Sequence, residues 1–335
     1  MIFTGNVYYN GKIRKGTLSV GEETEFTDSL ANNGMYGTII PMPVNAHTHI
    51  GDSFIKDEPM GDLPEIVGPG GFKHRQLENS SDGIIMEGIK NSTRFMERSG
   101  TLAYFDFREN GIKGAEFINH TDKEFIKPVV LGRPFKDDSI QAILDNTNGI
   151  GLSSISDMEY KEAIKISMLA KKNNKIMALH FSENVREDID RVLNLNPDLL
   201  VHGIEAHASD LQKIKSKNIP IVITPRSNIF FGKKPDYGKF RLAGIELMMG
   251  TDNVFITEPD LFAEMDFLYR YQRFKTYISP GEILNLAIDN PRKFMERNGI
   301  TYDEKYIFFK NALLNEYQIV TKKHYFNPFN ITKYE

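Results

Sequence analysis

Residues 41–53 read PMPVNAHTHIGDS, and this stretch places His47 and His49 at the end of an apolar run. Successive side chains of a β-strand alternate between its two faces, so positions i and i+2 point the same way. Two imidazoles at this spacing can bind one cation, although two histidines in a solvated loop would produce the same letters. The rest of the chain decides between a metal site and a loop.

The run that ends in these histidines is the first of eight short apolar runs rich in β-forming residues. Segments with helical periodicity lie between most of them, and this alternation predicts a parallel sheet with helices outside it. The span from residue 41 to residue 303 is close to the ~250 residues of a (β/α)8 TIM-like barrel, which is the α/β fold that we expect. An open, doubly wound sheet is the alternative. The eight runs cover residues 39–50, 100–107, 125–134, 149–156, 175–183, 198–206, 219–228 and 245–253.

The two ends of the chain share a β-rich character. Near the amino terminus, an Asn-Gly pair lies between β-forming residues in MIFTGNVYYNGKI, which indicates a hairpin. Residues 304–335 again read as strands. We therefore expect residues 1–40 and 304–335 to form one small β subdomain, with residues 41–303 forming the barrel. Residues 56–73 are rich in Gly and Pro without periodicity, and we expect a loop over the site there.

Composition narrows the classes of function. The chain has 335 residues, of which 40% are hydrophobic and 26% charged, as in globular proteins. A net charge of −4 gives no support to nucleic-acid binding. The absence of cysteine excludes disulfides and thiolate metal sites, which leaves His, Asp and Glu as the strong ligands. No run reaches the length of a membrane span, so we expect a cytoplasmic protein with a small-molecule substrate and no membrane or nucleic-acid partner. A homo-oligomer is compatible with these features.

Polar residues with metal-binding chemistry recur at the carboxyl ends of the predicted strands. His180 ends the fifth run, and Glu183 follows it three residues later. The sixth run contains His202, and Asp252 ends the eighth. In a barrel these ends form the rim that holds the active site. His47, His49, His180 and Asp252 can ligate a divalent metal there, while Glu183 and His202 can flank a bound water.

Each of these residues also has an ordinary interpretation. A single strand-end histidine such as His180 is more often a hydrogen-bonded polar residue than a ligand. His202 could be buried and hydrogen-bonded, and Glu183 could be a solvated carboxylate at a helix start. GTD is common in turns, so Asp252 alone carries little weight. Their joint occurrence, in order and each at a strand end, favours a shared site.

This combination resembles the amidohydrolase superfamily. The elements are H-x-H in the first run, H-x-x-E in the fifth, H-G in the sixth and G-T-D in the eighth. The pattern is most similar to the branch of cytosine, guanine and S-adenosylhomocysteine deaminases and triazine hydrolases. GTLAYFDFRENG, TPRSNIFFG and TEPDLFAEMDF resemble further elements of that branch. The resemblance covers about residues 35–295.

The resemblance implies roles for these residues. His47, His49, His180 and Asp252 would hold one metal, Glu183 would shuttle protons, and His202 would contact the attacking water or the substrate. Glu183, His202 and Asp252 are thus the expected catalytic residues. Binuclear relatives use a carboxylated lysine at the fourth strand, but GLSSISD has no lysine, so one ion is favoured. Nitrogen and oxygen ligands without sulfur suit Zn2+, and also Fe2+ or Mn2+.

The expected reaction is hydrolytic deamination of a nitrogen heterocycle by a metal-activated water. Hydrolysis of a cyclic amide or of another C–N or C–X bond on the same scaffold is one alternative. A metal-retaining paralogue that binds a ligand without turnover is another, and the complete ligand set with Glu183 argues against it.

Four further residues suggest an anionic substrate. Arg108, Arg133 and Arg226 fall near the ends of the second, third and seventh runs, and His74 lies in FKHR after the first. We consider these four as candidate substrate-binding residues. Salt bridges within loops are the alternative explanation for the arginines.

Overall fold

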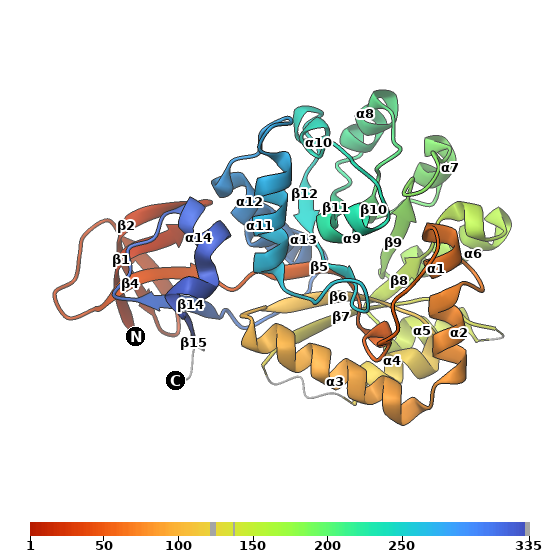
Figure 1. Ribbon diagram of the computed structural model, residues 1–335, viewed down its shortest axis with the longest axis horizontal. Helices are drawn as coiled ribbons and strands as arrows, with labels where there is room; N and C mark the ends of the chain where they lie inside the picture. Colours follow the sequence, from red (N-terminus) through yellow and green to blue (C-terminus); the bar gives the residue numbers. More distant parts are fainter. Residues whose placement is uncertain (121–124, 137, 332–335) are drawn as a thin grey trace.

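The computed structural model describes residues 1–120, 125–136 and 138–331. Figure 1 shows two units side by side: a small sheet at the left and a larger body of strands surrounded by helices. The strands divide accordingly into one six-stranded and one nine-stranded sheet. In the part of the chain that the structure describes, no helix combines the length and the apolar character needed to cross a membrane.

The nine-stranded sheet is parallel and closes into the predicted (β/α)8 barrel. Its order is β12-β11-β10-β9-β8-β7-β6-β5-β13. β12 and β13 are consecutive pieces of one chain segment, and they pair with β11 and β5 respectively. The eighth strand therefore joins the seventh strand to the first. The strands are β5 (Val44–His49), β6 (Ala103–Arg108), β7 (Lys127–Gly132), β8 (Gly149–Leu152), β9 (Ile176–Phe181), β10 (Leu199–His202), β11 (Ile221–Ile223), β12 (Leu247–Met249) and β13 (Asp252–Asn253).

Helices connect successive barrel strands and cover the outside of the sheet (Figure 1). The apolar side chains of the strands are buried, and most of them belong to the main core cluster of the protein, whereas Tyr104 and Val130 belong to a second cluster. The helices are α1 (Leu63–Val67), α2 (Phe72–Asn79), α3 (Asp82–Arg98), α4 (Gly111–Asn119), α5 (Ile140–Asn146), α6 (Tyr160–Lys172), α7 (Ile189–Asn194), α8 (Ala208–Ser216), α9 (Pro225–Phe230), α10 (Gly238–Leu242), α11 (Leu261–Gln272), α12 (Pro280–Ala287) and α13 (Asp289–Arg297). Short 3-10 helices, η1 (Ile50–Asp52) and η2 (Ile155–Asp157), follow β5 and β8.

The six-stranded sheet brings the two chain ends together, as the sequence predicts. Its order is β15-β14-β4-β1-β2-β3, and only the β1–β4 pair is parallel. A separate core cluster, which includes Phe3 and Phe308, fills one side of it. The division at residues 40 and 304 remains our proposal for the boundary. The strands are β1 (Ile2–Tyr9), β2 (Lys12–Val20), β3 (Thr24–Thr27), β4 (Met35–Pro41), β14 (Tyr306–Lys310) and β15 (Phe329–Ile331).

Two segments contain helix where the sequence predicts other structure. Part of the segment 304–335, expected to be all strand, folds as α14 (Glu316–Lys322) and η3 (Lys323–Phe326). Asn315 and Gln318 form a capping box that starts α14. In the expected loop 56–73, Asp62 and Glu65 cap α1 in the same way. Local side-chain hydrogen bonds thus create short helices that apolar periodicity does not reveal.

Candidate metal and catalytic site

The predicted metal-binding side chains meet at the carboxyl ends of the barrel strands. His47 and His49 come from β5, His180 from β9 and Asp252 from β13. The His47 Nε2 and His49 Nε2 atoms lie 3.3 and 3.6 Å from Asp252 Oδ1. His49 Nε2 lies 3.3 Å from His180 Nε2. The structure therefore brings all four side chains together.

Potential ligand atoms cluster in three overlapping groups, and within each group they lie within 4.8 Å of one another. The groups are His47 with His180 and His202, His47 with His49 and Asp252, and Glu183 with His202 and Asp252. His47 is completely buried, yet neither ring nitrogen has a hydrogen-bond partner among the described residues. Buried polar atoms are normally paired, so this unsatisfied imidazole and its nitrogen and oxygen neighbours fit a divalent cation.

Hydrogen bonds from outside the cluster orient two of these imidazoles. His180 Nδ1 donates to the Leu152 carbonyl at 2.8 Å. His49 Nδ1 lies 2.8 Å from Glu109 Oε1 and 3.1 Å from the Phe107 carbonyl. Each bond turns the Nε2 atom toward the cluster, as in the supporting shell of many metal sites.

Glu183 and His202 lie on the other side of the cluster. Glu183 Oε2 is 3.4 Å from His202 Nε2. Burial, followed by repulsion from Asp252, raises the pKa of Glu183 well above its usual value. Burial lowers the pKa of His202 to about 3, which favours a neutral imidazole. A carboxyl group and a neutral imidazole at this distance can exchange a proton with a bound molecule.

Asp252 and His202 are also fixed by side chains of α9 and of its N-cap residue, Thr224. Ser227 Oγ donates to Asp252 Oδ2 at 2.6 Å. Thr224 Oγ1 and Asn228 Nδ2 lie 3.2 and 3.3 Å from His202 Nδ1. These residues belong to the TPRSN stretch. Its Ser and Asn are the feature of the sequence that could have indicated hydrogen bonds to Asp252 and His202.

The backbone is strained where these side chains leave the strands. Ser182, His202 and Asp252 adopt positive φ angles of 44°, 71° and 68°, which residues other than glycine rarely adopt. Gly250 has a different constraint, because a Cβ added there would lie 2.6 Å from the His47 Cβ. The glycine of GTD therefore permits the close approach of the eighth strand to the first.

A buried charge network behind His49 was not predicted from the sequence. Glu109 accepts from Lys73 Nζ at 2.5 Å and from Arg108 Nη2 at 2.9 Å, besides its contact with His49. Lys73 also donates to Asn253 Oδ1 at 2.9 Å. Burial raises the pKa of the neighbouring Asp52 to about 8. The sequence signals for Glu109 are its position two residues after an apolar run and its place in the GTLAYFDFRENG stretch.

A cavity of about 160 Å³ opens beside the cluster. Residues of the covering segment 63–73 line one side of it, which agrees with the predicted cover over the site. The side chains that can ligate, transfer protons or carry charge along its wall are His49, Lys73, Arg133, Asp157, His180, Glu183, His202 and Asp252.

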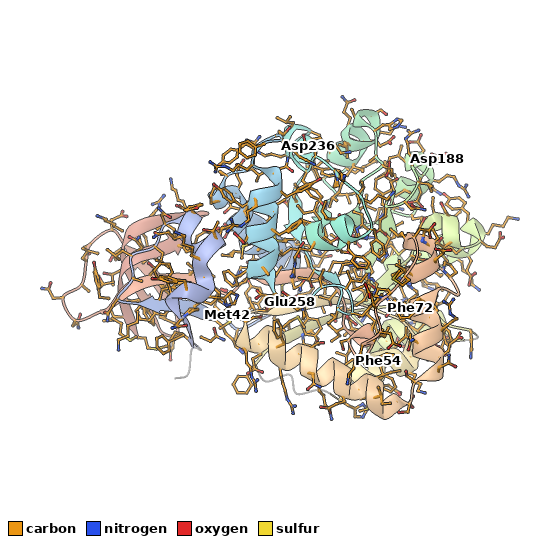
Figure 2. The ribbon with its side chains drawn as sticks, in the orientation of Figure 1. Met42, Phe54, Phe72, Asp188, Asp236 and Glu258 are labelled. Atoms are coloured by element: carbon orange, nitrogen blue, oxygen red, sulfur yellow. The ribbon has the colours of Figure 1, made fainter. Side chains whose placement is uncertain are left out.

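Three of the four candidate substrate-binding residues lie outside the lining of this cavity. Arg108 is 1% exposed and pairs with Glu109. Arg226 pairs with Glu264 and with Glu258, the latter labelled in Figure 2. His74 Nδ1 accepts from the Gly70 backbone N–H. For the two arginines, the salt-bridge alternative describes the observed contacts, and only Arg133 lines the cavity.

The chain belongs to the amidohydrolase family, whose model matches residues 38–299. This match confirms the resemblance predicted from the sequence motifs. The protein is accordingly a hydrolase that acts on carbon–nitrogen bonds other than peptide bonds.

Two archaeal relatives are similar over most of their length. An uncharacterised protein of Methanocaldococcus jannaschii is 34% identical over 322 residues, which covers 86% of this chain and 83% of the relative. A protein of Archaeoglobus fulgidus named "Putative aminohydrolase" is 31% identical over 267 residues, which covers 79% of this chain and 78% of the relative.

A solved structure with the same fold is the aminofutalosine deaminase of Helicobacter pylori in complex with methylthio-coformycin. It superposes with a TM-score of 0.76 over 98% of this chain and 97% of that chain, at 17% sequence identity. This likeness confirms the barrel with its attached small sheet.

Proposed function

We propose that this protein is a metal-dependent deaminase that hydrolyses an amino group from a nitrogen heterocycle. The observation that carries the proposal is the cluster of four histidines, Asp252 and Glu183, all of which except His47 line one cavity. A fold used by a known deaminase and an amidohydrolase family match support the same reaction class.

We assign His47, His49, His180 and Asp252 to one divalent ion, with Zn2+ as the first choice and Fe2+ or Mn2+ as alternatives. The donors are imidazole nitrogens and a carboxylate, which suit all three metals. A divalent ion bound there supplies an acidified water and polarises the substrate.

The roles of the other residues follow from their positions. Glu183 stands beside His202 at the cavity wall, where its carboxylate can accept a proton and return it to the ring nitrogen or the leaving amine. His202, fixed through Nδ1, can present Nε2 to negative charge that develops on the substrate. Asp252 can hold a ligand with Oδ1 while Ser227 occupies Oδ2.

Glu183→Gln tests this proposal most directly. The substitution keeps the size of the side chain but removes the proton acceptor, so we expect unchanged metal content and ammonia release lower by roughly 10²–10⁴-fold. Release of ammonia from purines, pyrimidines and pterins provides the assay, and elemental analysis provides the metal content. Glu162→Gln, on the exposed face of α6, is the matched control.

The outcomes separate this proposal from the alternatives. If the variant keeps activity within a few-fold of the wild type, then His202 or Asp252, and not Glu183, carries the proton. Loss of metal together with activity would make Glu183 a ligand. Hydrolysis without ammonia would indicate a cyclic amide or another leaving group, and tight binding without any turnover would indicate a non-catalytic paralogue.

A further inference from the structure

Arg133 differs from the other arginines near the ends of the barrel strands in having no carboxylate partner. Within the described residues, no carboxylate oxygen lies within the 4.0 Å ion-pair limit of its guanidinium. Among the described residues, its side chain makes a single hydrogen bond, a long one of 3.4 Å from Nε to the Gly151 carbonyl. By contrast, Arg108 and Arg226 are each neutralised by a glutamate.

The Arg133 side chain is partly buried in the wall of the cavity that holds the metal cluster. A guanidinium withdrawn from water is costly unless an anion or several acceptors compensate it. Burial accordingly lowers the pKa of Arg133 from its usual value. Lys73, the other cation of the wall, already contacts Glu109 at 2.5 Å. Arg133 is therefore the cavity cation that is left to bind an incoming anion.

Backbone hydrogen bonds hold Arg133, which directly follows β7, against the end of β6 and the start of α4. Its N–H donates to the Arg108 carbonyl at 2.8 Å, and its carbonyl accepts from the Gly111 N–H at 3.2 Å. Pro134 follows it and restricts its backbone to extended conformations. The backbone thus fixes where the side chain begins at the cavity wall, and only the side-chain torsions remain to be ordered when a ligand binds.

The neighbouring wall adds polar groups. Ser153 and Ser156 line the cavity with Arg133, at the end of β8 and in η2. Asp157 also lines it, but lies outside ion-pair distance of Arg133 in the described structure. Asp157 and Glu109 still attract the guanidinium across this longer distance, although neither forms an ion pair with it. A planar guanidinium with nearby hydroxyls suits a carboxylate or a phosphate group.

We propose that the substrate is a heterocycle bearing a carboxylate or phosphate, and that Arg133 binds this anionic group while the amino-bearing ring faces the metal cluster. This inference rests on the proposed deaminase function, since it names the substrate class of the same site.

The test compares matched compounds with and without the anionic group, using the metal-loaded full chain. The pairs are cytosine with 5-carboxycytosine, pterin with pterin-6-carboxylate, and adenosine with its 5′-monophosphate. The first two pairs test a carboxylate and the third tests a phosphate. Ammonia release gives kcat and KM, and the melting temperature in the presence of each compound measures binding without turnover.

Three variants accompany the wild type. Arg133→Met removes the charge, Arg133→Lys keeps the charge but loses the planar fork, and Arg75→Met removes an exposed arginine outside this cavity. We expect the wild type to prefer the anionic member of at least one pair. In Arg133→Met, KM for that member should rise roughly 10–100-fold, with kcat and metal content little changed. Arg133→Lys should retain part of the preference, and Arg75→Met all of it.

The two measurements distinguish failure of this inference from failure of the proposed function. Stabilisation by an anionic member that disappears in Arg133→Met, without ammonia release from any compound, would support the anion site and contradict the deaminase. Turnover of neutral members with equal KM in wild type and Arg133→Met would support the deaminase and overturn the anion site. A wild type that is stabilised by no anionic member would also overturn it.

Discussion

Some buried polar groups at the rim of the barrel lack partners among the described residues, whereas those at the seam between the barrel and the small sheet are paired. At the rim, both ring nitrogens of His47 are buried without a hydrogen-bond partner in the described structure, and Arg133 has no carboxylate. At the seam, Arg292 pairs with Glu304 and donates to the carbonyls of Ile288 and Met42. Figure 2 shows Met42 between the two units.

The difference indicates which buried polar groups are satisfied within the protein and which are available to a bound ligand. The seam satisfies its own charges, so it stabilises the fold without any bound group. The rim carries strained backbone at Ser182, His202 and Asp252 and polar groups that its own residues do not satisfy. Such a combination is typical of functional sites rather than of structural ones.

The strongest test of this comparison removes one of the proposed metal-binding side chains at the rim. His47→Ala should lower metal affinity by more than the ~10–100-fold loss seen when only a supporting residue is changed. Metal content should then fall from one ion per chain to a small fraction, and activity with it, as measured by elemental analysis after dialysis. His120→Ala, an exposed histidine after α4, is the control. An unchanged metal content in His47→Ala would contradict our assignment of the site.

An intermediate effect is expected at the seam. Arg292→Met should lower the free energy of unfolding by about 2–3 kcal/mol, because Glu304 and two carbonyls lose charge-assisted hydrogen bonds. Metal content and kcat should stay at wild-type values, which urea unfolding, elemental analysis and the ammonia assay would measure. Arg94→Met, exposed on α3, controls for loss of charge. A loss of metal in Arg292→Met would show that the seam and the rim are coupled.

The smallest effect concerns a paired carboxylate, Asp210, in the first turn of α8. The hydrogen bond from Arg186 lowers the pKa of Asp210 from its usual value of 3.8, and Asp210 also accepts from the His207 N–H at the start of α8. Asp210→Asn should cost about 1 kcal/mol, the scale of a helix cap.

The pH dependence of this effect has a definite sign. A lowered carboxyl pKa stabilises the fold above the unfolded value of 3.8, and this contribution disappears as the pH falls through the lower folded value. The difference in unfolding free energy between wild type and Asp210→Asn should therefore be constant from pH 7 to about pH 5 and shrink below about pH 4. A difference that grows on acidification, in urea titrations across this range, would contradict the assignment.

The sequence by itself determined the barrel, the chain-end sheet and the residues that meet at the rim. Apolar runs alternating with helical segments can form few folds, and the carboxyl ends of barrel strands converge whatever the loops contain. His47, His49, His180, His202 and Asp252 could thus be grouped before their distances were known.

Only the tertiary structure decided which charges are already paired. Arg108, Arg133 and Arg226 occupy equivalent positions after apolar runs, but their partners lie at different distances along the chain: Glu109 is adjacent to Arg108, whereas Glu264 lies 38 residues after Arg226. The contact of Lys73 with Glu109, and that of Glu109 with His49, likewise joins segments that have no common sequence pattern. Electrostatic pairing depends on distances of a few ångströms between side chains, and periodicity determines only the face and the strand end on which each residue lies.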